Sequence, residues 1–87
     1  MALHSVRWEL SCELAAEALG GYEEIDKAIF IYLEALERNP YAFPKVDTDW
    51  GSTRYVRTKP YGSTPELLWY FLIEANGDVA IVYVEKF

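Results

Sequence analysis

The stretch from Glu66 to Glu85, ELLWYFLIEANGDVAIVYVE, constrains the fold most strongly because it predicts a β-hairpin. Asn76 and Gly77 tolerate the positive φ angles that the two central residues of a type I′ turn require. The runs on both sides are rich in β-branched and aromatic residues, which is typical of strands. A two-residue loop at Asn76-Gly77 then sets the register. The predicted pairs are Trp69 with Val84, Tyr70 with Tyr83, Phe71 with Val82, Leu72 with Ile81, Ile73 with Ala80 and Glu74 with Val79.

Alternation of side chains along the two strands predicts two very different faces. One face is wholly apolar, so we expect the rest of the chain to bury it. It carries Leu67, Trp69, Phe71, Ile73, Ala80, Val82 and Val84. The other face mixes tyrosines, aliphatic groups and carboxylates, and a chain of 87 residues has little material left to cover it. It carries Leu68, Tyr70, Leu72, Glu74, Val79, Ile81, Tyr83 and Glu85.

Two helices are predicted before the hairpin. Ser11 can cap a short helix that Gly20-Gly21 ends. A longer helix is predicted over residues 22–38, where apolar side chains recur at i, i+3, i+4, i+7, i+8 and i+11. Phe30 and Ile31 lie outside this stripe, so they either widen the buried face or contact a partner. The stripe consists of Ile25, Ala28, Ile29, Tyr32, Leu33 and Leu36.

The remaining segments complete a single α+β domain over residues 1–87. Residues 4–10 and 52–59 alternate between apolar and polar side chains, which predicts two further strands, and residues 40–51 are interpreted as a loop. The element order is therefore β-α-α-β-β-β. We expect a small antiparallel sheet with the two helices packed on one face.

The composition bounds the function. A net charge of −6 argues against a free-standing nucleic-acid binder, although STRYVRTK forms a basic island from Arg54 to Lys59. No apolar run approaches the about 20 residues of a membrane span, and the start of the chain lacks the pattern of a signal peptide. Cys12 is the single cysteine, so we expect a cytoplasmic protein without internal disulfides, and Cys12 to be a buried apolar residue.

The uncovered sheet face is the candidate functional site. Tyr55, Arg57, Lys59, Tyr70 and Tyr83 would combine cationic and aromatic groups there. Such cations hold phosphate, and tyrosine stacks on a base or transfers a proton. The alternative is that the cations solubilise a strand while the tyrosines cover their neighbours. Zinc-ligand spacing and phosphate-binding loops are not found, and we predict no metal and no cofactor. The acidic pairs Glu23-Glu24 and Asp47-Asp49 are interpreted as solvated surface.

Four features together resemble the RelE/ParE toxin superfamily of bacterial toxin–antitoxin modules. They are the element order β-α-α-β-β-β, the ending LERNP of the long helix (Leu36–Pro40), the basic strand Arg54-Tyr55-Val56-Arg57, and the hairpin that follows, WYFLIEANGDVAIVYVE. The resemblance implies the β-α-α-β-β-β fold and an antitoxin as protein partner. For RelE-type members it implies a metal-independent mRNA endoribonuclease at the ribosome, and for ParE-type members inhibition of DNA gyrase.

Carried over residue by residue, the nuclease interpretation gives each basic residue a role. Arg54 and Arg57 would bind phosphate, although strand alternation puts them on opposite faces. Lys59 or Lys86 would stabilise charge on the transferring phosphate, and Tyr83 or Tyr70 would move a proton or stack on a base. The sequence departs from that pattern in two places, because it has Leu67-Leu68 where such enzymes carry an arginine and it ends Glu85-Lys86-Phe87.

These departures favour a second interpretation of the same fold. The protein would be a non-catalytic binding module, ParE-like or degenerate. Its uncovered sheet face would contact a protein segment or a second copy of the chain. The predicted contact residues are Tyr55, Leu68, Tyr70, Leu72 and Ile81.

Overall fold

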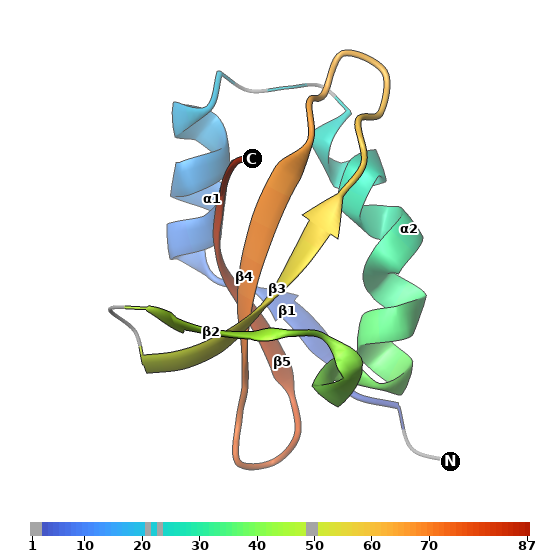
Figure 1. Cartoon of the computed structure of the whole chain (residues 1–87), viewed down its shortest axis with the longest axis vertical. Coiled ribbons are helices and arrows are strands. Elements are labelled where there is room, and N and C mark those ends of the chain that lie inside the picture. Colours follow the sequence, from blue (N-terminus) through green and yellow to red (C-terminus); the bar gives the residue numbers. More distant parts are fainter. Residues whose placement is uncertain (1–2, 21, 23, 49–50) are drawn as a thin grey trace.

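The computed structural model describes residues 3–20, 22, 24–48 and 51–87 as an α+β domain (Figure 1). Two α-helices, a short 3₁₀ helix (η1) and a five-stranded mixed sheet make up this part of the chain. Within the described residues, neither helix combines the length and apolar character that crossing a membrane requires. The elements are β1 (Val6–Trp8), α1 (Leu10–Ala18), α2 (Ile25–Arg38), η1 (Pro40–Ala42), β2 (Lys45–Thr48), β3 (Gly51–Thr58), β4 (Leu67–Ile73) and β5 (Val79–Lys86).

The strands are ordered β1-β5-β4-β3-β2, and this corrects two predictions. First, the sheet is mixed and not antiparallel, because β1 runs parallel to β5. The chain between them, which includes both helices and strands β2 to β4, is far longer than the crossover that a parallel pair needs. Second, residues 45–48 form strand β2, paired antiparallel with β3, in a segment predicted to be a loop. Asp47 and the preceding Pro44 suggested a loop, but an edge strand tolerates such residues.

The β4–β5 hairpin forms as predicted, but its loop has three residues, Ala75 to Gly77. The amide of Gly77 donates to the Glu74 carbonyl at 2.8 Å, and the amide of Glu74 donates to the Asp78 carbonyl at 2.8 Å. Gly77 has φ +91°, whereas no non-glycine residue in the described chain has a positive φ. The prediction of a type I′ turn is therefore wrong, because that turn needs a positive φ at Asn76 as well.

The longer loop shifts the register by one residue on β5. The predicted pairs Trp69–Val84 and Tyr70–Tyr83 are confirmed. Beyond an irregularity between Tyr70 and Phe71, however, the pairs nearer the loop differ from the prediction. A shift of one residue reverses the face of every side chain it affects. The observed pairs are Phe71 with Ile81, Leu72 with Ala80 and Ile73 with Val79.

The register shift corrects one predicted contact residue. Ile81, expected on the uncovered face, lies in the core with an exposed fraction of 1%. Val79 is buried with it. The irregular step in β5 (the β5 bulge) is also tied to α1, because the Ser11 hydroxyl donates to the Val82 carbonyl at 2.6 Å. Ser11 is therefore not the helix cap that was predicted, since α1 begins at Leu10 and Glu9 holds the N-cap position.

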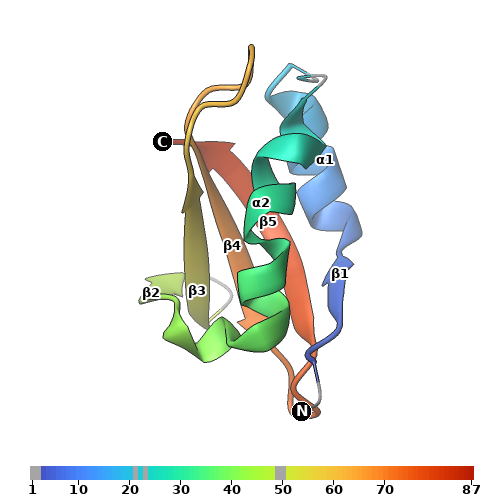
Figure 2. The ribbon, with the colours of Figure 1, turned by 90° about the vertical axis from the view of Figure 1, so that its right-hand side faces the viewer.

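Both helices pack on the same face of the sheet, as predicted (Figure 2). Cys12 is buried in α1, as expected, and the predicted stripe of α2 packs into the core. Phe30 and Ile31 are exposed, so they do not widen the buried face. The buried core comprises Cys12, Ile29, Leu36, Val56, Leu67, Trp69, Phe71, Val79, Ile81 and Val84.

Candidate functional site

Three tyrosines form a row across the centre of the uncovered face. Tyr55 of β3 pairs with Tyr70 of β4, which pairs with Tyr83 of β5. The rings of Tyr70 and Tyr83 lie 6.3 Å apart between centroids, at an interplanar angle of 37°. All three are half-buried although the helices pack on the opposite face, so they cover one another as cross-strand neighbours do. We call these residues the tyrosine row.

A carboxylate fixes Tyr70 within the tyrosine row. Its hydroxyl donates to Oε1 of Glu85 at 2.7 Å. Burial, followed by the hydrogen bond to Glu85 and its negative charge, raises the pKa of Tyr70 to about 12. Tyr70 therefore stays protonated near neutral pH and acts as a hydrogen-bond donor, not as a base.

Arg57 lies on the same face, one row further along β3, and it is held by a carboxylate. Its Nε and Nη2 donate to Oε2 and Oε1 of Glu66, each at 3.0 Å. The Phe87 ring stacks on the guanidinium, with 3.7 Å from Cζ to the ring centroid. The hydrogen bond to Glu66 raises the pKa of Arg57, and the same bond lowers the pKa of Glu66. Both groups are ionised at neutral pH, and their charges cancel locally.

Arg54 does not join Arg57, as strand alternation predicted. It is opposite Phe71, which is buried on the helix-covered face, and the β3–β4 register runs without a bulge from Arg54 to Thr58. The Arg54 Nη1 donates to the carbonyls of Tyr41 at 3.0 Å and Phe43 at 2.6 Å. These bonds give Arg54 a structural role, which is to tie η1 and the segment after it to the sheet.

Of the two candidate lysines, Lys86 is separated from the tyrosine row, and Lys59 lies just beyond the end of β3. Lys86 pairs with Leu67, which is buried on the helix-covered face, so Lys86 stands on that side of the sheet at its exposed end. Lys59 follows the last residue of β3 and is exposed. Of the predicted catalytic residues, the structure thus places Arg57 and Tyr83 on one face and leaves Arg54 and Lys86 on the other.

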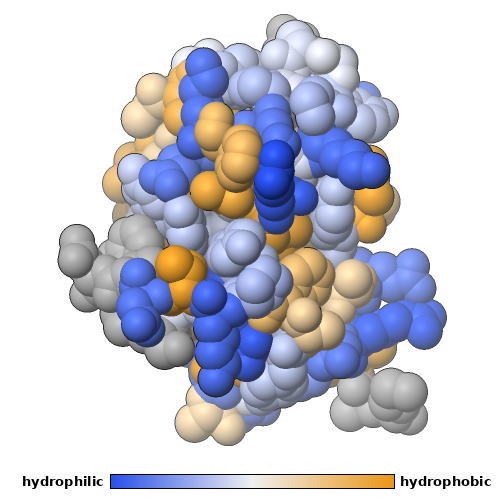
Figure 3. All heavy atoms as spheres, viewed as in Figure 1, coloured by the Kyte–Doolittle hydropathy of each residue, from blue (hydrophilic) through white to orange (hydrophobic). Residues whose placement is uncertain are grey.

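The predicted contact residues lie on the uncovered face, with the exception of Ile81. Leu68 and Leu72 are half-buried on the uncovered face beside the tyrosine row, while Ile81 is in the core. Figure 3 looks onto this face, where apolar side chains alternate with charged ones. Sequence reasoning did not anticipate the roles of Glu66 and Phe87. The β3–β4 register brings Glu66 beside Arg57, and the β4–β5 register brings Phe87 beside Glu66, so both registers are needed to locate these residues.

The described part of the chain contains no group of three or more His, Cys, Asp or Glu side chains that could hold a metal ion. Glu23 and Asp49, each one member of an acidic pair noted in the sequence, lie outside the described residues. The polar groups near the tyrosine row are instead paired with one another, as Arg57 with Glu66 and Tyr70 with Glu85.

Comparison with known proteins found no match among protein-family models, curated proteins or solved structures. The RelE/ParE family therefore stays a proposal. The chemistry of the uncovered face bears on what such a protein would do.

Proposed function

We propose that this chain is a RelE/ParE-like toxin of a bacterial toxin–antitoxin module that acts by binding a protein target, not by cutting RNA. The surface that binds is the uncovered sheet face around the tyrosine row. The observation that carries the proposal is the bidentate pairing of Arg57 with Glu66 at 3.0 Å. It converts the cation nearest the tyrosines from a phosphate ligand into one half of a neutral pair.

The residues of this face suit a protein interface. Tyrosine and arginine are enriched at the centres of such interfaces, where isolated charges are depleted. Here Glu66 neutralises Arg57, and the hydroxyl of Tyr70 is satisfied by Glu85. Of these four residues, only Glu85 presents a charge that a protein partner would have to meet. Leu68 and Leu72 supply aliphatic surface beside the rings. A cognate antitoxin would neutralise the protein by covering the same face.

The same residues disfavour RNA as the ligand. Glu85 places a carboxylate beside the tyrosine row, where an RNA substrate would bring phosphates, and Glu66 neutralises the arginine that would bind them. Binding of nucleic acid relies on cations that replace the counterions of the phosphates. Arg54 is occupied with carbonyl oxygens on the other face, and the whole chain carries a net charge of −6. Repulsion thus acts both locally and at longer range.

The test is induced expression in a bacterial host, with growth followed and the 5′ ends of ribosome-bound mRNA mapped. We expect growth arrest without new mRNA ends. Arrest should be lost in the double variant Tyr70→Ser, Tyr83→Ser, because both rings leave the centre of the surface. Tyr61→Ser is the matched control, since Tyr61 is an exposed tyrosine in the loop between β3 and β4. Arg57→Ala should weaken arrest only partly.

Two results would contradict the proposal. One is arrest accompanied by in-frame mRNA cleavage that Arg57→Ala abolishes. The other is the absence of any arrest, which would remove the toxin assignment itself.

A metal-independent mRNA endoribonuclease remains the second candidate, because Arg57 and the tyrosine row do share one face. On that interpretation Glu66 would have to release Arg57 when a phosphate binds. Glu66→Gln removes the competing charge while keeping the side-chain shape. A nuclease should then cut mRNA at least as well as the wild type, whereas a protein-binding surface should show no cleavage in either form.

A further inference from the structure

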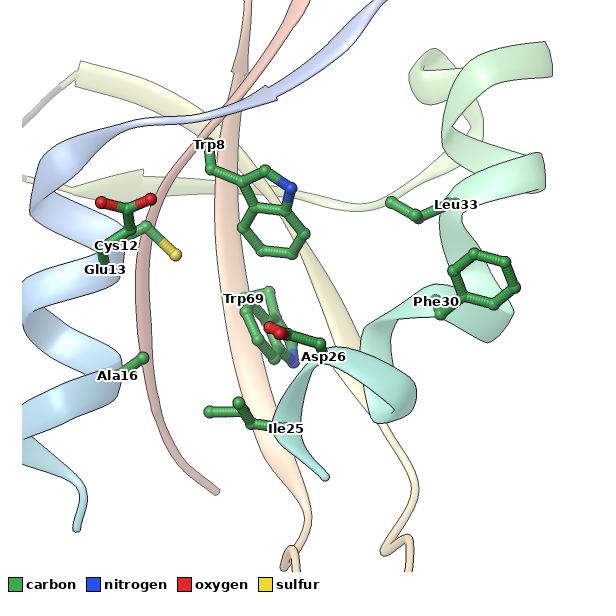
Figure 4. Close-up of a pocket in the computed structure, with 9 residues that line it drawn as sticks. All are labelled: Trp8, Cys12, Glu13, Ala16, Ile25, Asp26, Phe30, Leu33 and Trp69. Carbon is green, nitrogen blue, oxygen red and sulfur yellow. The ribbon is translucent and has the colours of Figure 1, made fainter. Parts of the chain in front are cut away.

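A groove runs between α1 and α2 on the helix-covered side of the sheet, away from the tyrosine row (Figure 4). Its volume is about 360 Å³, which falls in the range of sites that bind small molecules. Trp69 of β4 and Trp8 of β1 lie between the helices. In Figure 4 the Cys12 thiol and the Leu33 side chain point toward the two indoles from opposite sides. The groove is thus formed by β1, α1 and α2, which follow one another in the sequence, and by the distant strand β4.

Two indole rings form the floor of the groove, and the N–H of the buried one is already hydrogen-bonded. The two indoles meet edge to face, with centroids 5.6 Å apart and an interplanar angle of 70°. The indole Nε1 of Trp69 donates to the Thr58 hydroxyl at 3.1 Å, so this N–H requires no ligand. Trp69 is buried, whereas Trp8 has an exposed fraction of 38%. A ligand would therefore lie against Trp8.

Phe30 adds a second accessible aromatic ring. It also lines the groove, and 71% of it is exposed. Most of the Phe30 side chain is therefore in contact with water, and a ligand in the groove could bury this apolar surface. The sequence left open whether Phe30 widens the core or contacts a partner, and the structure excludes the core.

Acidic side chains lie on both walls of the groove, one from each helix. Glu13 of α1 and Asp26 of α2 are both among the lining residues. Glu13 and Glu17 are one turn apart in α1, a helix whose sequence LSCELAAEA contains no lysine or arginine. On α2, Asp26 begins a stripe that continues at i+4, i+7 and i+11 with Phe30, Leu33 and Glu37. An aromatic site between carboxylates favours a cation.

We propose that this groove binds a small organic ammonium ion with an apolar body. The body would cover Trp8, Phe30 and Leu33, and the ammonium group would lie near the carboxylates of Glu13 and Asp26. The exposed aromatic faces add attraction, because a cation over an aromatic ring is stabilised by the ring quadrupole. This site is separate from the protein-binding surface proposed above and does not depend on it.

The experiment titrates the purified full chain with three ligands that share one apolar body and differ in charge. These are phenylbutylammonium, phenylbutanol and phenylbutyrate. Binding is followed by NMR through the indole signals and by calorimetry. We expect saturable binding with the order ammonium, then alcohol, then carboxylate, and shifts of the Trp8 indole signal. Raising the salt concentration should weaken binding of the ammonium ligand alone.

Variants separate the role of the carboxylates from that of the apolar walls. Glu13→Gln and Asp26→Asn should each weaken binding of phenylbutylammonium by about two- to fivefold, the usual effect of one partly exposed charge. Their affinity for phenylbutanol should not change. Glu34→Gln is the matched control, because Glu34 is an exposed carboxylate of α2 outside the lining, paired with Arg38 at 2.9 Å. It should leave all three affinities unchanged.

Three results would overturn the proposal. The first is no saturable binding of phenylbutylammonium by the wild type. The second is equal affinity for the ammonium and the alcohol, which would leave a merely apolar cleft. The third is an equal loss of affinity in Glu34→Gln and Glu13→Gln, which would show that the net charge of the protein, and not the carboxylates of the groove, attracts the ammonium ion.

Discussion

Replacing Ile81 and its neighbour Val82 by alanine tests the β5 bulge, which decides the side chains that reach each face of the sheet. Ile81 is 1% exposed and packs in the core, so Ile81→Ala should lower the free energy of unfolding by about 3 kcal/mol. Val82 is only half-buried, and Val82→Ala keeps the carbonyl that accepts the Ser11 bond. Its cost should be about 1 kcal/mol. Without the bulge, Val82 would lie in the core and Ile81 on the uncovered face, so Val82→Ala would cost more than Ile81→Ala.

Thermal unfolding followed by circular dichroism measures the difference. In a domain of this size 1 kcal/mol corresponds to about 4–8 °C in Tm. We therefore expect Ile81→Ala to lower Tm by about 15–20 °C and Val82→Ala by about 5 °C. Urea titration gives the same comparison at constant temperature, and an unchanged m-value shows that both variants unfold from the same compact state. An equal or larger loss for Val82→Ala would refute the observed register and restore the two-residue loop.

Three further predictions concern single groups. The pKa of Tyr70 rises in the fold to about 12 from an ordinary value near 10. Between these pH values the unfolded chain loses this proton first, so the free energy of unfolding should fall as pH rises. Tyr70→Phe should flatten that part of the curve of stability against pH, and an unchanged slope would show that the fold does not retain the proton. Burial, and secondarily the charge of Glu13, raises the pKa of Cys12 to about 12, so a thiol reagent at pH 8 should label Cys12 only after unfolding; rapid labelling of the native protein would contradict its burial. Gly77→Ala should cost about 1–2 kcal/mol in urea titration, because Gly77 has φ +91°, and a neutral effect would argue against the three-residue loop.

Local periodicity accounts for the parts of the fold that could be predicted. The apolar stripe of α2 and the alternation of β4 depend on repeats within one element, so they follow from the sequence directly. The predicted pairing of Tyr70 with Tyr83 is observed, but only because the β5 bulge offsets the extra residue of the loop. The opposite faces of Arg54 and Arg57 follow from alternation in the same way.

The candidate site was predicted only in part, because its chemistry depends on partners from other elements. The sequence placed Arg57 among the tyrosines, but the pairing of Arg57 with Glu66 arises from the β3–β4 register and the stacking of Phe87 from the β4–β5 register. Ile81 was assigned to the wrong face because a bulge cannot be located from alternation alone. The groove at Trp8 was not predicted at all, since it exists only where β1 and both helices meet.

By itself the sequence determined that two helices cover one face of a sheet and that tyrosines gather on the other, because both features follow from side-chain periods of 3.6 and 2 residues. Only the tertiary structure decided that β1 runs parallel to β5, that the β5 bulge buries Ile81, and that Glu66 neutralises Arg57. The physical reason is that register and charge pairing are set by contacts between distant segments. No local repeat in the sequence records which residue of one strand faces which residue of another.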